Sequence, residues 1–299
     1  MPFLDAHTHA YPESDRHLVV ERAALLDGHL PSDSPTKWQL FLDGSIDSLI
    51  EEEKKAGFDG LVLLPISGRP EGCSPLNHWV AEQAGRYPQI IPFACLNPLS
   101  PTAEQDLTEA LSLGLKGIKF HSVLQQITPL HPQTLKWLEM IQASGLPVLM
   151  DSMNLSGIRQ RKPHMAPILD FWALFETNPA VIKFLAKTFP KIQFIAAHMG
   201  CLYGWDQLDG LYELENVHFD LSYAQEILPL KELKKMIFRK GIDHILFGSD
   251  TPWRQPVKAW QRFLELRLTS GEIEKIGGGN LQNLLNMDSE RLPRSLLRG

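Results

Sequence analysis

The segment GIKFHSVLQQITPLHPQTLKWLEMIQASGLPVLMD, residues 117–151, decides the fold of this chain. It begins with a short apolar run, Gly117–His121, passes through an amphipathic stretch, Pro132–Ser144, and ends in a second apolar run, Pro147–Asp151. Such runs are too short for helices and predict strands that are buried on both faces, as in a parallel sheet covered by helices. The Gly145-Leu146-Pro147 turn is typical of a loop between a helix and the next strand. The segment therefore predicts a strand–helix–strand unit.

The same unit recurs along the whole chain. Eight apolar runs predict strands, namely Pro2–His7, Gly60–Pro65, Ile90–Leu96, Gly117–His121, Pro147–Asp151, Gln193–His198, Val217–Leu221 and His244–Gly248. The helices predicted from amphipathic stretches are Ile46–Ala56, Asn77–Tyr87, Thr102–Leu113, Pro132–Ser144, Ala180–Phe189, Leu208–Glu215, Lys231–Arg239 and Val257–Leu266. This alternation implies parallel strands, and eight repeats favour closure into a barrel. We predict an α/β fold, a (β/α)8 TIM barrel, with residues 1–299 forming a single domain.

Two connections are longer than is usual between a strand and the next helix. The first runs from about Ala10 to Gly44 and follows strand 1, and the second runs from about Ser152 to Pro179 and follows strand 5. Loops that follow barrel strands lie on the face that carries the active site. We therefore expect these long loops to form a lid or a rim around a substrate.

Composition limits the partners of the protein. Of its 299 residues 43% are hydrophobic and 21% charged, a balance that allows a large buried core. The formal net charge is −6, without a Lys/Arg block, so neither nucleic acid nor an anionic membrane is favoured as a partner. Cys73, Cys95 and Cys201 are scattered, as free thiols in a reducing compartment are. With no apolar stretch long enough to span a membrane, a cytoplasmic protein is expected, and a homo-oligomer is allowed.

Polar side chains stand at the ends of several predicted strands, where burial without a partner is costly. They are His7, His9, Lys119, His121, Asp151, His198 and Asp250. Because residues two apart on a strand point to the same side, His7 and His9 can present both imidazoles to one point. Two imidazoles and a carboxylate such as Asp250 are typical ligands of a catalytic zinc ion, which activates water and polarises a carbonyl.

Four motifs at these strand ends resemble those of the amidohydrolase superfamily. They are Asp5-Ala6-His7-Thr8-His9, Gly117-Ile118-Lys119-Phe120-His121, Ile195-Ala196-Ala197-His198-Met199-Gly200 and Leu246-Phe247-Gly248-Ser249-Asp250-Thr251-Pro252. The last three look like motifs of the amidohydrolase-related branch, which includes aminocarboxymuconate semialdehyde decarboxylase and hydrolases of small carboxylated or lactone substrates. Each motif alone is weak, but four in register over nearly the whole chain are specific.

The resemblance implies roles for the matching residues. His7, His9 and Asp250 would be metal ligands, Asp250 would also transfer protons, and His198 would hydrogen-bond the attacking water or the substrate. Family members commonly have a His at the end of strand 5, where this chain has Asp151. Three consequences are open, which we rank in this order. Asp151 takes the place of that histidine ligand, His121 completes the ligand set, or tight metal binding is lost.

Other polar and aromatic residues have less specific interpretations. Lys119 either is carbamylated and bridges two metals, or pairs with Asp151 or Asp5, and it is a candidate for substrate binding. Asp5 is expected to orient a ligating imidazole. In the cluster Arg159, Arg161, Lys162 and His164, Arg161 can clamp a substrate carboxylate, unless the cluster is only a solvated loop. Trp253 and Trp205 can wall a substrate site or pack in the core.

The function predicted first is hydrolysis of a small carboxylated lactone, ester or amide by metal-activated water, with Asp250 and His198 as catalytic residues. The metal expected is Zn, with Mn or Mg as alternatives. A second hypothesis is a non-oxidative decarboxylase that uses the same metal site. A third is a barrel that binds a small molecule without turnover. Cleavage of DNA is disfavoured by the acidic balance.

Overall fold

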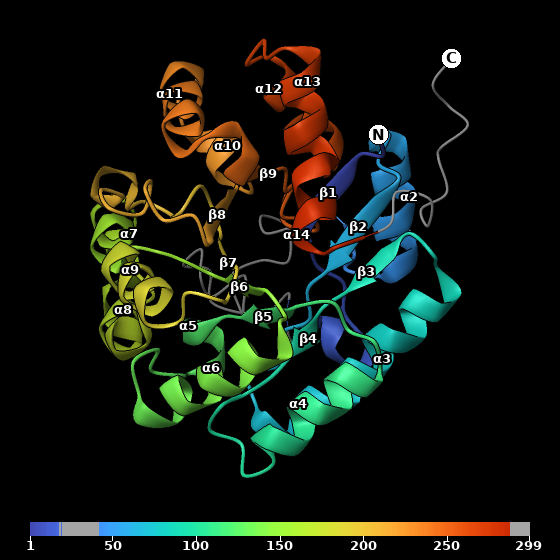
Figure 1. Ribbon diagram of the computed structural model, residues 1–299, viewed down its shortest axis with the longest axis vertical. Helices are drawn as coiled ribbons and strands as arrows, with labels where there is room; N and C mark the ends of the chain where they lie inside the picture. Colours follow the sequence, from blue (N-terminus) through green and yellow to red (C-terminus); the bar gives the residue numbers. More distant parts are fainter. Residues whose placement is uncertain (18, 20–41, 288–299) are drawn as a thin grey trace.

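Nine short strands lie at the centre of the computed structural model, which describes residues 1–17, 19 and 42–287 (Figure 1). They are β1 (Leu4–Thr8), β2 (Gly60–Leu63), β3 (Ile90–Pro92), β4 (Ala94–Cys95), β5 (Ile118–Phe120), β6 (Val148–Met150), β7 (Phe194–Ala196), β8 (Val217–Asp220) and β9 (Ile245–Leu246). Six of the eight predicted apolar runs contain one strand each, the run Ile90–Leu96 contains two, and β1 extends one residue beyond the run Pro2–His7.

The strands are parallel and close into a barrel. Strands β1 to β3 pair in chain order, as do β4 to β9. The two sets join at Phe93, because its N–H bonds to Leu63 while the N–H of Ala94 bonds to Gly117. The barrel closes where the N–H of Ala6 donates to the carbonyl of Phe247, at 2.9 Å. The predicted (β/α)8 fold is therefore confirmed. The single domain over residues 1–299 stays a prediction.

Helices surround the strands on the outside of the barrel (Figure 1). The described α-helices are α2 (Ile46–Ala56), α3 (Cys73–Arg86), α4 (Ala103–Ser112), α5 (Ser122–Gln125), α6 (Pro132–Ser144), α7 (Leu155–Arg161), α8 (Ala166–Trp172), α9 (Pro179–Thr188), α10 (Ala224–Ile227), α11 (Leu230–Lys240), α12 (Pro256–Leu264), α13 (Ser270–Glu274) and α14 (Asn280–Leu284). Local chemistry fixes their ends. Ser45 caps α2 by accepting the N–H of Ser48, and α6 ends at Gly145, whose φ of 74° favours glycine.

The strands are buried on both faces, and alternate residues belong to different parts of the core. Leu4, Ala6, Val62 and Leu64 pack with other inward-facing strand residues inside the barrel. Ile118 and Phe120 belong instead to the larger core between the strands and the helices. Lys119 lies between these two residues and is also buried, so its side chain is directed to the barrel interior.

One predicted helix is wrong. The segment Leu208–Glu215 forms turns after a short 3₁₀ helix at Trp205–Gln207. Leu208, Leu211 and Tyr212 are buried at a spacing that imitates a helix. Gly210, however, has φ of 84°, and a Cβ there would lie 2.2 Å from Lys183 Nζ, so this position is built for a tight turn.

The two long connections have different outcomes. Most of the first, residues 18 and 20–41, lies outside the described residues. The second contains α7 and α8 and contributes to the wall of the cavity described below. It therefore forms a rim, as predicted.

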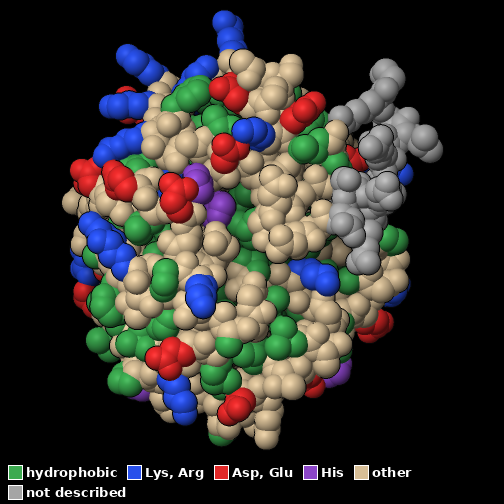
Figure 2. Space-filling model, in the orientation of Figure 1, with side chains coloured by type: hydrophobic (Ala, Val, Ile, Leu, Met, Phe, Trp, Pro, Cys, Tyr) green, Lys and Arg blue, Asp and Glu red, His purple; other side chains and the backbone are tan. Residues whose placement is uncertain are grey.

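The outer surface and the cysteines carry little further information on function. Acidic and basic side chains are interspersed over the face shown in Figure 2. None of the described helices has the length and apolar character that a membrane span requires. The three cysteines are free, as predicted, and all three are buried.

Candidate metal centre

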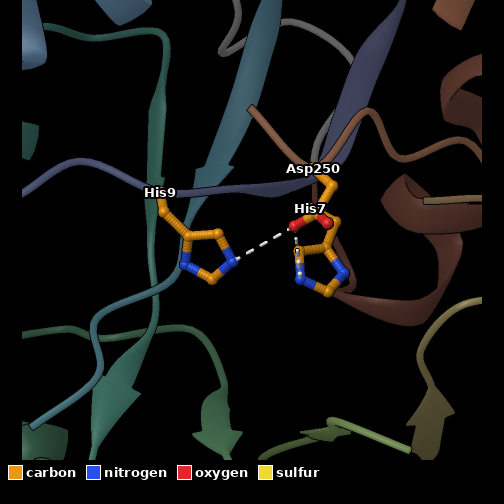
Figure 3. A group of neighbouring side chains, drawn as sticks. All are labelled: His7, His9 and Asp250. Atoms are coloured by element: carbon orange, nitrogen blue, oxygen red, sulfur yellow. Dashed lines mark ion pairs between the residues drawn. The ribbon is translucent and has the colours of Figure 1, made fainter. Parts of the chain in front are cut away.

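Three predicted ligands meet at the carboxyl ends of β1 and β9. Asp250 Oδ1 lies 3.7 Å from His7 Nε2 and 3.6 Å from His9 Nε2 (Figure 3). Among the described residues, His7, His9 and Asp250 are the group of metal-ligating side chains whose ligand atoms all lie within 4.8 Å of one another. All three side chains are buried. Residues from opposite ends of the sequence thus converge on one point, as the strand motifs predict.

The remaining ring nitrogens of both histidines are already bonded to protein acceptors. His9 Nδ1 donates to the carbonyl of Leu64 at 2.8 Å, and His7 Nδ1 donates to Asp220 Oδ2 at 2.9 Å. These bonds select the tautomer in which Nε2 carries the lone pair. A metal-binding imidazole is commonly held in this way by a carboxylate or a carbonyl. The three side chains therefore fit a divalent cation.

The backbone places Asp250 and His7 together. The N–H of Asp250 donates to the carbonyl of His7 at 2.9 Å, which continues the pairing of β9 with β1. Asp250 has φ of 70°, an uncommon value for a residue that is not glycine. At the end of β9, a Cβ on Gly248 would lie 2.9 Å from the Cβ of His7. Glycine at 248 is thus needed for His7 to sit where it does.

A second cluster is centred on Asp151, the residue that departs from the family pattern. Its Oδ2 atom lies 3.4 Å from Lys119 Nζ, 3.4 Å from His198 Nε2 and 3.5 Å from His121 Nε2. Its Oδ1 atom is buried with no hydrogen-bond partner among the described residues. Lys119 Nζ also lies 3.3 Å from His7 Nε2 and so joins the two clusters. The ion pair of Lys119 with Asp151 was one of the two interpretations offered by the sequence.

Burial and these neighbours shift the proton affinities. Burial and the Lys119 ammonium lower the pKa of His7 to about 4, and burial lowers the pKa of His121 to about 4. Burial also favours neutral His198, but the Asp151 carboxylate outweighs it and raises the pKa of His198 to about 9. Burial would raise the pKa of Asp250, yet the neighbouring imidazoles hold it below its usual value. The cluster therefore contains both an ionised carboxylate and a protonated imidazole.

Asp220 is a functional residue that the sequence reasoning missed. It ends β8 and is fully buried. One oxygen accepts from His7, and the other accepts the N–H of His198 at 3.1 Å and the N–H and hydroxyl of Ser222. Ser222 in turn receives the Nδ1–H of His198 at its carbonyl, at 3.2 Å. The signal was present in the sequence, because Asp220 is a polar residue at the end of an apolar strand, like His7 or Asp151.

Asp5 has a different role from the one expected. Its Oδ1 atom accepts the backbone N–H groups of His7 and Ser249, at 2.9 and 3.0 Å, and no imidazole. The imidazole of His7 is oriented by Asp220 instead, while Asp5 holds the backbone of β1 against that of the loop after β9. Burial raises the pKa of Asp5 to about 7.

A cavity of about 470 Å³ opens next to the two clusters. His9, His121, Asp151, His198 and Asp250 line it, together with Trp253. Its other lining residues are Tyr11, Ile66, Val123, Leu124, Met153, Ile158, Lys162, Met165, Trp172, Leu202, Tyr203, Tyr223 and Arg254. The lining therefore combines the polar side chains of the two clusters with many apolar and aromatic side chains.

The cationic cluster of the second long connection is divided between the cavity and the outside. Arg161 is exposed, donates to the carbonyl of Gly157 at 3.1 Å and stacks on Tyr203 at 4.7 Å. It is not among the described residues that line the cavity, whereas its neighbour Lys162 is. Arg254, which sequence reasoning did not single out, lines the cavity as well.

A parallel α/β barrel with buried histidines and aspartates at the carboxyl ends of its strands defines a class, the metal-dependent barrel enzymes. Within that class the chain belongs to the amidohydrolase family, since the family model described as Amidohydrolase matches residues 4–286. No curated protein sequence matches the chain significantly.

Solved structures of several enzymes have the same fold. A dihydroxybenzoic acid decarboxylase from Polaromonas, with bound manganese and the inhibitor 2-nitroresorcinol, has a TM-score of 0.72 at 20% identity, over 95% of this chain and 97% of that one. A 5-carboxyvanillate decarboxylase from Sphingomonas paucimobilis has a TM-score of 0.71 at 14% identity, over 96% and 99%. A Pseudomonas putida protein proposed to be a 2-pyrone-4,6-dicarboxylic acid hydrolase has a TM-score of 0.66 at 16% identity, over 95% and 97%. At these identities the likeness concerns the fold.

Proposed function

We propose that the protein is a metal-dependent hydrolase of a small carboxylated lactone, ester or amide. The observation that carries the proposal is the convergence of His7 Nε2, His9 Nε2 and Asp250 Oδ1, with the other nitrogen of each imidazole bonded to the protein. Such preorganisation of ligand atoms is typical of a metal site that keeps a position open for water.

In this proposal His7, His9 and Asp250 hold the ion, and Asp151 completes the set. The buried Oδ1 of Asp151 supports its inclusion, since it has no hydrogen-bond partner among the described residues. His121 is the weaker candidate, because its Nδ1 accepts the N–H of Leu124 and its Nε2 faces Asp151. A ligand set of two imidazoles and carboxylates suits Zn, and the carboxylates also suit Mn or Mg.

A divalent cation held by these residues would act as a Lewis acid that polarises a carbonyl and makes water more acidic. Asp250 lines the cavity and accepts the proton of the attacking water. His198 is held at Nδ1 by the carbonyl of Ser222, and its Nε2–H, which faces Asp151 Oδ2, would turn to the oxygen that becomes negatively charged once Asp151 binds the ion. Lys119 compensates the charge of Asp151, and Trp253 with the apolar wall limits access of bulk water.

Decarboxylation of a small aromatic acid at the same site is the second candidate. An apolar wall of Val123, Leu124 and Ile158 lines the cavity, and such surroundings favour reactions in which a carboxylate loses its charge. Two of the structures with this fold belong to decarboxylases of aromatic acids. The two candidates require different products, so product analysis separates them.

The test combines metal analysis with product analysis. The protein is purified without added metal, its metal content is measured, and it is assayed for ring opening and for carbon dioxide release on carboxylated lactones and aromatic acids. We expect about one Zn or Mn ion per chain and ring opening that Asp250→Asn abolishes without a change in the circular dichroism spectrum. Asp209→Asn is the matched control, because Asp209 is exposed and pairs with Arg239 on the surface. A protein that refuses metal supports a binding function instead, and unchanged turnover in Asp250→Asn contradicts the proposal.

A further inference from the structure

Two of the three cysteines are in contact at the carboxyl end of β4, on the side of the barrel that carries the candidate metal centre. Cys95 ends β4 and Cys73 begins α3, and their Sγ atoms lie 3.6 Å apart although the residues are 22 positions apart in the chain. Both side chains are fully buried in a small cluster that also contains Leu76. Cys201 belongs to the larger core instead. The chemistry proposed above uses none of the three cysteines.

The surrounding structure holds the two thiols in contact. Helix α3 packs beside β4 (Figure 1). Asn77, also in α3, donates from Nδ2 to the carbonyl of Cys95 at 2.9 Å and accepts the N–H of Cys95 at Oδ1, at 2.8 Å. A disulfide bond is about 2.05 Å long, so the sulfur atoms of Cys73 and Cys95 need to approach by about 1.5 Å. Bond formation therefore requires a local shift of two side chains that already touch.

The two thiols have unequal surroundings. Cys95 Sγ accepts the backbone N–H of Ser67 at 3.2 Å and an Nε2–H of Gln125 at 3.6 Å. Cys73 Sγ instead faces an acceptor, the carbonyl of Arg69, at 3.9 Å. Hydrogen-bond donors stabilise a thiolate, the form in which cysteine is a nucleophile. The hydrogen bond with Cys95, together with burial, raises the pKa of the Cys73 thiol. Cys95 is therefore the thiol that reacts first.

Residues 66–72, between β2 and α3, form a segment that covers the pair. This covering segment touches both sulfur atoms, through the N–H of Ser67 and the carbonyl of Arg69. Its outer side faces solvent, since the side chains of Arg69 and Glu71 are 76% and 71% exposed. A small oxidant such as hydrogen peroxide therefore reaches the thiols when the covering segment moves aside.

Gln125 connects the pair to the cavity. Its Nε2 donates to Cys95 Sγ, and its Oε1 accepts the backbone N–H of His121 at 2.9 Å. His121 lines the cavity, as does Ile66, which precedes Ser67 in the covering segment. A sulfur atom that has moved to its partner is a poorer acceptor for both N–H donors. Oxidation should therefore loosen the covering segment and the contact with Gln125.

We propose that Cys73 and Cys95 form a redox site, in which a peroxide converts the two thiols into an intramolecular disulfide that loosens one wall of the cavity. The Cys95 sulfur attacks hydrogen peroxide, the O–O bond breaks, a sulfenic acid forms and one water leaves. The Cys73 sulfur then displaces the sulfenic hydroxyl, which leaves as a second water while the S–S bond forms. In total the two thiols lose two electrons and two protons, and the peroxide is reduced to two waters. A dithiol reductant reverses the change.

The test treats the folded full-length protein with hydrogen peroxide. Remaining thiols are alkylated with iodoacetamide in denaturant, and the peptides are mapped by mass spectrometry without reduction. We expect the loss of two of the three thiols and one cross-linked pair of peptides, which joins Cys73 to Cys95 and is lighter by two hydrogens. Cys201 should be recovered in the alkylated form. Treatment with dithiothreitol should restore all three thiols.

Three variants separate the roles of the cysteines. In Cys73→Ser the reaction should stop at the sulfenic acid of Cys95, which dimedone traps. In Cys95→Ser the thiol of Cys73 should react with peroxide at least tenfold more slowly, because it lacks the donors that stabilise a thiolate. Cys201→Ala is the matched control, and it should form the same disulfide as the wild type.

Amide hydrogen exchange measures the effect of the disulfide on the cavity wall. The N–H groups of Ser67 and His121 should exchange about fivefold faster in the oxidised wild type, the effect of about one lost hydrogen bond. Peptides from α11, on another side of the barrel, should exchange at the same rate in both forms.

The proposal is overturned if the wild type keeps three thiols at a peroxide dose that oxidises glutathione in a parallel sample, or if Cys201 enters the cross-link. A disulfide that leaves the exchange of Ser67 and His121 unchanged overturns the effect on the cavity wall. Neither the thiol count nor the exchange rates depend on bound metal or on turnover. Failure of the proposed function is therefore distinguishable from failure of this inference.

Discussion

Replacement of Asp220 by Asn tests whether the carboxylate that accepts from His7 Nδ1 controls the metal affinity of His7, His9 and Asp250. Asp220 receives the Nδ1–H of His7 and the backbone N–H groups of His198 and Ser222, and it is fully buried. Asn has nearly the same shape but no charge, and its amide group places two donors where donors already point. The imidazole of His7 then loses the acceptor that fixes its tautomer.

The magnitude follows from the proton affinity of the carboxylate. Burial alone would raise the pKa of Asp220, but the donors from His7, His198 and Ser222 hold it at about 2, against an ordinary value of 3.8. A lowered pKa stabilises the fold above the unfolded-state value, and the contribution is lost as pH falls from 3.8 towards 2. At pH 7 it is fully present and amounts to about 2 kcal/mol, at about 1.4 kcal/mol per pH unit. Loss of a carboxylate that orients a ligating imidazole also lowers metal affinity by about 10- to 100-fold.

Both quantities are measurable on one set of samples. Urea unfolding at pH 7 gives the change in the free energy of unfolding, and competition with a chromophoric chelator gives the zinc affinity. Asp209→Asn serves again as the surface control. A variant at position 220 that binds zinc within twofold of the wild type would refute the reasoning, because the Asp220–His7 bond would then have no influence on the ligand atoms.

Three further predictions concern other parts of the barrel. Gly248→Ala should lower zinc affinity at least tenfold and destabilise the fold by about 1–3 kcal/mol, because the new Cβ would lie 2.9 Å from that of His7. Gly85→Ala is the control, since a Cβ there has nothing within 4 Å. Equal zinc affinities of Gly248→Ala and the wild type would contradict the prediction. Burial lowers the pKa of His218 to about 3 from 6.5, so its stabilising contribution is present above 6.5 and lost as pH falls below it. Between pH 7.5 and 5 the wild type should therefore lose about 2 kcal/mol more than His218→Gln in urea unfolding, and equal losses would show that His218 is protonated in the fold. Asp151→Asn should destabilise the fold by about 3–5 kcal/mol, since it leaves Lys119 without its buried partner, and a melting temperature equal to that of the wild type would contradict this.

Much of the fold was predictable because the barrel repeats one simple pattern. Short apolar runs and amphipathic stretches identify strands and helices when both layers of the barrel are buried. The segment Leu208–Glu215 escaped this logic, because Leu208, Leu211 and Tyr212 have helical spacing while Gly210 adopts a left-handed turn. Apolar spacing alone does not distinguish a packed turn from one turn of helix.

The site was predictable as far as strand ends specify it. The parallel arrangement of the strands brings His7 and His9 near Asp250, but a register shift between Asp5 and Thr8 interrupts the alternation along β1, and the sequence did not predict it. Distances between loop residues were not specified by any periodicity, so Arg161 was favoured over Arg254 although the latter lines the cavity. Which of several polar neighbours orients His7 was likewise set by packing across the barrel, and Asp220 holds that position.

The closure of the barrel has a consequence for the synthesis of the protein in the cell. His7 is synthesised 243 residues before Asp250, which follows β9, the strand that pairs with β1. A nascent chain therefore has no complete set of metal ligands until residue 250 has been made. Contacts between such distant residues also form slowly, so cation loading should be among the last events of maturation.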